Sequence, residues 1–250
     1  MSTLNATDWP IRRDMVGTYY EYNKFGDSPS MSLNTEMIVS DLGNSQTFAV
    51  AAAATSVVSS SANDAAAGTG ARTVLIEGIL GSANNYQMIR EVITLAGVTP
   101  VVLTNQFYFV HRMKVLTTGA GGVTAGAVTC SIDGNDVAQL LAGNNGTLMA
   151  VYFAQGCDFV GNDVRVEIVD WYGSIKRAAT TAADYIIYKT SAGSGTWAPI
   201  GKRSGQSSGT TADTWKLPRI IAPGDGIYVS STPSANGAFS TAGFDLRFYI

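Results

Sequence analysis

His111 is the only histidine in this 250-residue chain, so any acid–base chemistry that uses histidine depends on one position. It lies in the apolar run Phe107–Thr118, where Phe109 and Met113 share its face of an expected strand. A histidine with such neighbours is typically a hydrogen-bonded residue of a core or an interface, and we favour that interpretation over a general base. No Ser-His-Asp arrangement follows from its spacing to other residues.

Other residue groups offer further candidates for chemistry. Glu167 and Asp170 could form a carboxylate pair of the glycosidase kind, but three residues apart on a strand they point to opposite faces, so we expect ordinary surface charge. The segment Asp133–Asp136 resembles part of a calcium loop without its later glutamate, and Asp-Gly after a strand is typical of a two-residue hairpin. Gly119–Gly122 follows a strand, as a phosphate-binding loop does, but neither a lysine nor a helical pattern comes after it. We therefore expect no catalytic residue, no cofactor and no metal, and predict that the protein is not an enzyme.

The chain has two cysteines, Cys130 and Cys157, which are too few for a disulfide framework. Neither has a second cysteine or a histidine at metal-ligand spacing. Cys130 shares a strand face with Val128 and Ile132, which predicts a buried free thiol.

Composition argues against several classes of partner. The formal net charge is −3 with 16 Lys and Arg residues, and the longest basic run is Arg12-Arg13, so we expect no binding to nucleic acid. The longest stretch of low polarity, residues 48–58, is too short to span a bilayer. The first ten residues lack the features of a secretion signal. We expect neither membrane association nor individual secretion.

The elements that must position these residues follow a period of two. Three β-branched, apolar runs at Ala71–Leu80, Tyr86–Leu95 and Phe107–Thr118 are separated by segments with Gly, Asn and Pro, as in consecutive antiparallel strands. The last residues, Gly243–Ile250, alternate apolar and polar side chains. Many short strands with such turns predict an all-β chain, an antiparallel β-sandwich or jelly roll, in one large or two consecutive β-domains.

We divide the chain into three parts. Residues 1–35 have no regular period and are expected to form an irregular N-terminal arm, 36–145 an antiparallel β-domain, and 146–250 a jelly-roll-like β-sandwich, with a boundary at Gly143–Gly146. The arm has aromatic residues that disordered tails usually lack, so it packs either on its own chain or on a neighbouring subunit. We assign a partner interface to five of them: Trp9, Tyr19, Tyr20, Tyr22 and Phe25.

Three parts of the sequence from about Gly68 to Ile250 carry a family resemblance. They are Gly70–Gly78 with Glu91–Val101 and Thr104-Asn105, then Arg112–Gly122 running into Gly126–Thr129, and finally Gly146–Tyr152 with Ile221–Val229. In these motifs the chain is similar to accessory virion proteins of tailed bacteriophages of the marine and cyanobacterial kind. The motifs are turns and strand cores, so they specify a scaffold. The chain departs from the family pattern at Phe153–Cys157, where a proline-containing turn is expected.

The resemblance implies a virion structural protein: a capsid decoration or cement protein, or a knob, that binds the major capsid protein and stabilises the shell. It further implies a homotrimer at a symmetry axis, located on the capsid surface of the virion after synthesis in the host cytoplasm. The alternative is a tail or fibre component that binds a carbohydrate or receptor. In that alternative Trp171, Trp197 and Trp215 stack on sugar rings, whereas their other interpretation is core packing.

Overall fold

The computed structural model describes residues 19–176, 182–206 and 210–250. Within these ranges the regular structure consists of strands β1 to β16 and two short 3₁₀ turns, η1 (Gly43–Ser45) and η2 (Ser82–Asn84), and no α-helix occurs. The named strands pair in antiparallel fashion throughout. The prediction of an all-β, antiparallel fold is confirmed.

Eight strands form a sandwich of two sheets, which we call the jelly roll. In chain order they are β1 (Tyr19–Met31), β10 (Val151–Phe153), β11 (Arg165–Lys176), β12 (Ala182–Thr190), β13 (Trp197–Gln206), β14 (Thr210–Ile221), β15 (Gly226–Pro233) and β16 (Ala238–Tyr249). β1 pairs with β16, β10 with β15, β11 with β14, and β12 with β13, so the series folds back on itself like one long hairpin. Further pairing of β16 with β11 and of β15 with β12 rolls this hairpin into sheets of order β1-β16-β11-β14 and β10-β15-β12-β13. The short strand β2 (Met37–Ile38) adds to β15.

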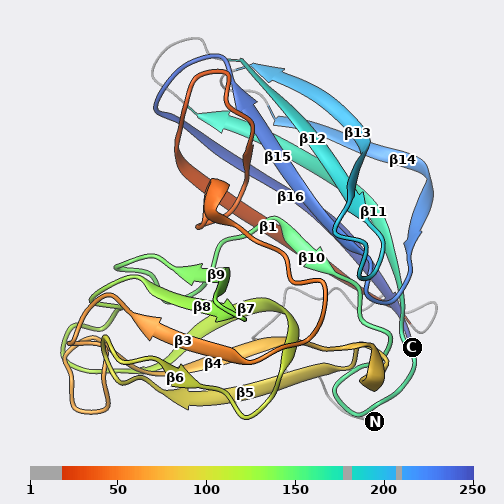
Figure 1. Ribbon diagram of the computed structural model, residues 1–250. Coiled ribbons are helices and arrows are strands. Elements are labelled where there is room, and N and C mark those ends of the chain that lie inside the picture. Colours follow the sequence, from red (N-terminus) through yellow and green to blue (C-terminus); the bar gives the residue numbers. More distant parts are fainter. Residues whose placement is uncertain (1–18, 177–181, 207–209) are drawn as a thin grey trace.

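The strands between β2 and β10 form a second sandwich, which we call the central sandwich. They are β3 (Thr55–Ser59), β4 (Ala71–Leu80), β5 (Met88–Thr94), β6 (Val101–Val102), β7 (Phe107–Thr118), β8 (Val128–Ile132) and β9 (Asn135–Leu140). Its two sheets have the orders β6-β3-β8-β9 and β5-β4-β7. Figure 1 shows this sandwich below the jelly roll, with β10 between the two. The central sandwich is therefore inserted between the first and second strands of the jelly roll.

The structure corrects the expected arrangement of the N-terminal segment and of the domains. Residues 19–31, which were expected to be irregular, form β1, and Tyr19 lies opposite Tyr249 at the other end of the chain. The pattern did not predict this strand because its buried face carries Lys24 and Ser28 in addition to apolar residues, so hydropathy does not alternate. The two β-domains are also not consecutive, because the chain leaves the jelly roll after β1 and returns at β10. Residues 1–18 lie outside the described ranges.

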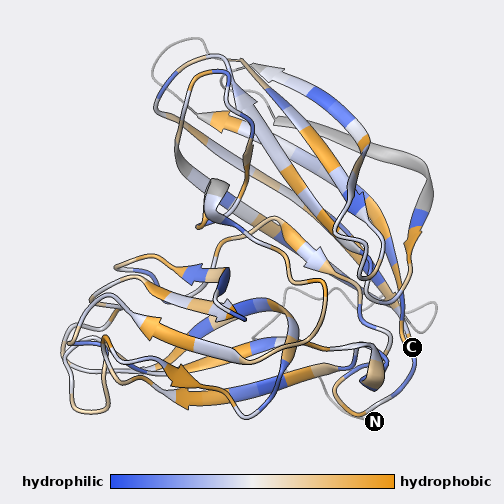
Figure 2. Ribbon diagram, viewed as in Figure 1, coloured by the Kyte–Doolittle hydropathy of each residue, from blue (hydrophilic) through white to orange (hydrophobic). Residues whose placement is uncertain are grey.

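Each sandwich has its own apolar core, and β10 contributes to both. Tyr152 lies in the jelly-roll core with Trp171 and Phe244, whereas Val151 and Phe153, on the opposite face of β10, belong to the core of the central sandwich. Figure 2 shows hydrophobic and hydrophilic residues alternating along several jelly-roll strands, as strands with one buried face require. A strand whose two faces serve two cores fixes the sandwiches to one another.

Short-range turn signals are accurate in the central sandwich. Asp133 and Gly134 have φ angles of 49° and 75° and connect β8 to β9, with Ile132 opposite Asn135. Positive φ at both central residues is the geometry of a type I′ hairpin, which favours Asp-Gly. The prediction of a hairpin at this position is confirmed.

Asp64 holds together the loops at one end of the central sandwich. Its carboxylate accepts hydrogen bonds from the Ser59 hydroxyl (2.6 Å) and from the backbone N–H groups of Ala71 (2.7 Å), Ala125 (2.9 Å) and Gly126 (2.9 Å). Burial acts to raise the pKa of this carboxyl, but these hydrogen bonds outweigh it, and the pKa lies below its ordinary value. One ionised side chain therefore joins the end of β3, the start of β4 and the loop before β8.

Candidate functional site

The junction between the two sandwiches contains His111. This residue is buried on β7, its Nε2 lies 2.8 Å from the carbonyl oxygen of Phe153 on β10, and its ring stacks on Tyr152 with centroids 4.5 Å apart. From β1, the buried ammonium of Lys24 donates a hydrogen bond to the His111 carbonyl oxygen. The prediction of a hydrogen-bonded core or interface histidine is confirmed: the His111 ring contacts β10, and its backbone carbonyl oxygen accepts the hydrogen bond from β1.

Burial changes the protonation of both side chains at this junction. It lowers the pKa of His111 to about 3, with a further lowering by Lys24 and an opposing effect of the hydrogen bond to Phe153. It also lowers the pKa of Lys24 to about 7, and Arg112 adds to this effect while Glu77 and Asp41 oppose it. A base with a pKa of about 3 binds protons too weakly for acid–base catalysis near neutral pH. The contacts of Lys24 and His111 therefore fit a structural role in joining β1, β7 and β10.

A buried ion cluster lies on the neighbouring strands. Glu77 of β4 pairs in register with Arg90 of β5 and with Arg112 of β7. Its two carboxylate oxygens accept hydrogen bonds from Nε of Arg90 and Nε of Arg112, each at 2.6 Å. The Arg90 guanidinium also lies over the Phe159 ring, 4.1 Å from its centroid. The carboxylate is almost fully buried and is engaged from both sides, so it ties the three strands together.

Aromatic rings fill the junction beside these polar groups. Phe48, which precedes β3, stacks on Tyr228 of β15 with centroids 5.5 Å apart and lies 4.6 Å from the Trp197 ring. Trp197 in turn lies 4.6 Å from Tyr228 and meets Phe153 edge-on at 5.9 Å. The outer face of the sheet β10-β15-β12-β13 thus contacts the central sandwich mainly through aromatic side chains.

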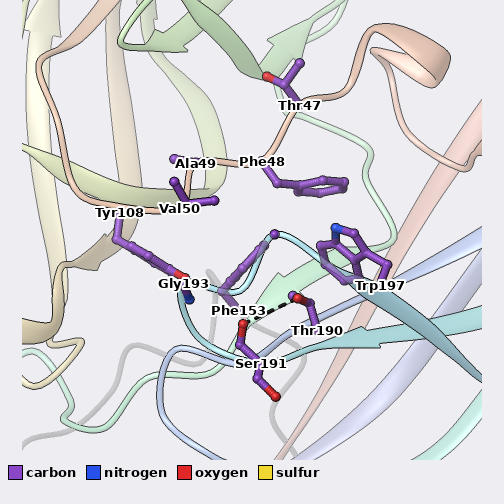
Figure 3. Close-up of a pocket in the computed structure, with 11 residues that line it drawn as sticks. Thr47, Phe48, Ala49, Val50, Tyr108, Phe153, Thr190, Ser191, Gly193 and Trp197 are labelled. Carbon is purple, nitrogen blue, oxygen red and sulfur yellow. Dashed lines mark hydrogen bonds between the residues drawn. The ribbon is translucent and has the colours of Figure 1, made fainter.

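A pocket of about 330 Å³ opens at this aromatic contact, as Figure 3 shows. It is lined by residues 47–50, by Tyr108 and Phe153, and by Thr190, Ser191, Gly193, Gly195 and Trp197 from the end of β12 to the start of β13. All of these side chains are uncharged. The pocket therefore combines ring faces with hydroxyl groups, which suits a neutral ligand.

The five aromatic residues predicted to form a partner interface differ in their burial and in whether the structure describes them. Tyr22 is buried in the jelly-roll core, and Tyr20 is partly buried. Phe25 is 44% exposed on the opposite face of β1. Tyr19 begins β1, whereas Trp9 lies outside the described ranges. Of the predicted set, Phe25 offers the largest described exposed surface.

The three tryptophans considered for sugar stacking also differ. Trp171 is fully buried in the jelly-roll core, so its ring is not accessible to a ligand. Trp197 is partly buried and lines the junction pocket. Trp215 lies in β14, and its side chain is outside the described part of the structure. Trp197 is therefore the candidate that remains for stacking.

Glu167 corrects one expectation, because it is 5% exposed and not a surface charge. It lies on β11, which has β16 on one side and β14 on the other. The Tyr249 hydroxyl donates a hydrogen bond to its carboxylate (2.9 Å), and Arg165 pairs with it. Long side chains from the same strand and its neighbour thus cover the carboxylate.

Sequence reasoning overlooked one pattern and one residue. Gly205–Gly209 fits G-x-S-x-G, a pattern that marks a nucleophile only between a strand and a helix. Its serine lies outside the described ranges, and the described elements on either side, β13 and β14, are both strands. The overlooked residue is Lys24. It is a single lysine in an aromatic segment, and nothing in that pattern indicates that it is buried.

Cys130 and Cys157 are buried and free. Over the described ranges, no group of three or more His, Cys, Asp or Glu residues could hold a metal ion.

No helix in the described part of the chain is long and apolar enough to cross a membrane.

No protein-family model matches the chain, and neither does any curated protein. Two solved structures align at 11% identity: a structure of the Gt strain of infectious bursal disease virus (TM-score 0.21, 96% of this chain and 74% of that chain) and a VP2 subviral particle of the same virus (TM-score 0.25, 99% and 76%). At such TM-scores these alignments establish no shared fold, so the jelly-roll assignment depends on the strand pairing alone.

Proposed function

We propose that this protein is a virion structural component, and specifically a capsid decoration protein that binds the major capsid protein and reinforces the shell. The observation that supports this best is a jelly roll with a second sandwich inserted between its first two strands. Jelly rolls occur in viral capsid proteins, and also in lectins and cupins, so the fold by itself leaves the function open. The resemblance of its turn and strand motifs to those of phage accessory virion proteins favours the first of these.

The junction supports this role because it joins both sandwiches into one body. β10 serves both cores, and Lys24 and His111 connect β1 to β7 and β10. A protein that reinforces a shell must resist relative movement of its parts. The buried ionisable groups Lys24, Glu77 and His111 are all engaged in internal contacts, which favours a role in binding over one in catalysis.

β1 is the element through which we expect contact with the capsid. It is the edge strand of its sheet, so one side of its backbone is unpaired within that sheet. Phe25 adds an exposed aromatic side chain at this edge. An edge strand of this kind suits the addition of a strand or loop from a partner. A homotrimer around a symmetry axis, located on the capsid surface after synthesis in the host cytoplasm, would present three such edges.

Cosedimentation with undecorated capsids tests the proposal. The native protein is expected to bind, and Phe25→Ser is expected to weaken binding about tenfold, because an exposed aromatic anchor is lost. Val160→Ser, at a position that is 70% exposed in a loop after β10, is the matched control and should bind as the native protein does.

A second variant without residues 1–18 tests the contribution of Trp9 and leaves β1 intact. A deletion as far as residue 30 would remove the buried Tyr22 and Lys24 and would test folding instead. Failure of the native protein to bind capsids would overturn the proposal, and binding to isolated tails would favour the alternative of a tail or fibre component.

A further inference from the structure

The loop between β12 and β13, on one side of the junction pocket, is held in place by hydrogen bonds and an ion pair. The Thr190 hydroxyl donates a hydrogen bond to the Thr196 carbonyl oxygen (2.7 Å), which closes the loop between β12 and β13. The Asp225 carboxylate accepts a hydrogen bond from the backbone N–H of Ala192 (3.1 Å) and lies 2.8 Å from Nζ of Lys189. The charged groups thus support the loop, and the pocket wall is formed before any ligand arrives.

Glycines keep the mouth of the pocket open. Gly193 and Gly195 have φ angles of 68° and 64°, a conformation that favours glycine, and a Cβ atom on Gly195 would lie 3.4 Å from Cγ1 of Val50 across the mouth. The backbone N–H of Gly193 donates a hydrogen bond to the Tyr108 hydroxyl oxygen (3.1 Å), which connects the loop to β7. The two sandwiches therefore meet around the pocket without filling it.

The chemistry of the lining is amphipathic and neutral. Figure 3 shows the Phe48 and Trp197 rings on one side and the Thr190 and Ser191 side chains on another, with Phe153 between them. Ring faces favour the C–H face of a sugar, and the exposed backbone of residues 191–195 favours its hydroxyl groups. The absence of charged side chains from the lining disfavours an acidic or basic ligand.

We infer that this pocket binds a neutral saccharide, with one sugar ring packed against Trp197 and Phe48 and its hydroxyl groups directed to the loop between β12 and β13. The volume of about 330 Å³ is at the lower end of the range for ligand pockets and accommodates a single ring better than a long chain. A sugar ring would use both the ring faces and the exposed loop backbone, whereas an apolar peptide side chain would use the ring faces alone. The inference does not depend on the capsid role, because sugar binding and capsid binding are measured separately.

Saturation-transfer NMR with the native protein tests the inference. The probes are the methyl glycosides of glucose, galactose, mannose and N-acetylglucosamine, with N-acetyltryptophanamide as a neutral aromatic probe of the peptide kind. At least one glycoside is expected to receive saturation. Val50→Trp places a large ring at the mouth and should abolish the signal, as should Trp197→Leu.

Val102→Trp is the matched control, because Val102 is 71% exposed on β6 and does not line the pocket, whereas Val50 is 57% exposed at its mouth. The control should retain the native signal. Saturation of none of the four glycosides, an undiminished signal in Val50→Trp, or transfer to N-acetyltryptophanamide alone would each overturn the inference. A circular dichroism spectrum of β type in every variant shows that loss of signal is not loss of fold.

Discussion

The two sandwiches are held together by different means. The central sandwich buries Glu77 and Asp64, and their partners come from within the same segment of chain, with Arg90 13 residues and Arg112 35 residues from Glu77. The jelly roll has an apolar core and is closed by the pairing of Tyr19 with Tyr249 at the far end of the sequence. The central sandwich therefore adds to its apolar core a buried carboxylate with two arginine partners close in sequence, whereas the jelly roll is closed by the pairing of strands from its two distant ends.

Glu77→Ala is expected to have the largest effect, and it tests the ionic half of this comparison. The variant removes the carboxylate between Arg90 and Arg112, and loss of one partner of a buried ion pair typically costs about 3–5 kcal/mol. Urea denaturation should show this decrease in the free energy of unfolding. Glu21→Ala is the control on the jelly roll, where a partly exposed pair with Arg247 should contribute less than about 1 kcal/mol. Equal losses in the two variants would contradict the comparison.

Asp64→Ala is expected to cost about 3 kcal/mol, because two buried backbone N–H groups, one part-buried N–H group and the Ser59 hydroxyl lose their acceptor. The pKa of Asp64 is lower in the folded chain than in the unfolded chain. Its contribution is therefore present above pH 4 or so and is lost as the pH falls through the folded pKa. Denaturation of the native protein and of Asp64→Ala between about pH 2 and pH 7 should converge at the acid end. A gap that stays constant over this range would refute the ionised role of Asp64.

Lys24→Met tests the junction itself and is expected to stabilise the protein by about 2 kcal/mol at pH 7, because it removes a buried ammonium. The pKa of Lys24 is about 7 in the folded chain, below its ordinary value, so the unfolded chain binds more protons at higher pH. The advantage of the variant should therefore be largest at and below pH 7 and should shrink as the pH rises toward 10. Thermal melts of both proteins measure this difference, and an advantage that grows with pH would show that Lys24 is not held in a buried site.

His111→Gln should give the smallest effect, because glutamine keeps a donor for the Phe153 carbonyl oxygen. The pKa of His111 is about 3 in the folded chain, so the unfolded chain takes up the proton first as the pH falls below 6.5. Between pH 7 and pH 5.5 the native protein should lose about 1 kcal/mol more stability than the variant. Parallel pH profiles of the two proteins would mean that His111 is accessible to solvent.

Sequence patterns predicted the central sandwich better than the jelly roll. The alternation in Phe107–Thr118 and the Asp-Gly turn at Asp133 are local signals, and β7 and the β8–β9 hairpin follow them. The position of His111 among apolar neighbours likewise predicted its burial. In these cases the partner residues are close in sequence, so the pattern already contains the information.

The other features depend on contacts between residues that are far apart in the sequence, which a local sequence pattern does not indicate. β1 contains Lys24 on its buried face, and this lysine finds its acceptor, the His111 carbonyl oxygen, only when the two sandwiches meet. Glu167 is covered by Tyr249, which lies 82 residues further along the chain. The pocket is also formed by segments around Phe48, Tyr108 and Trp197, and no spacing in the sequence indicates that they converge.

Imaging of intact virions, with an antibody against this protein as the label, tests the central proposal most directly. We expect label, and two-lobed density of the shape in Figure 1, on the outer surface of the capsid at positions repeated by the symmetry of the shell. Label confined to the tail, or virions that lack the protein, would contradict the account.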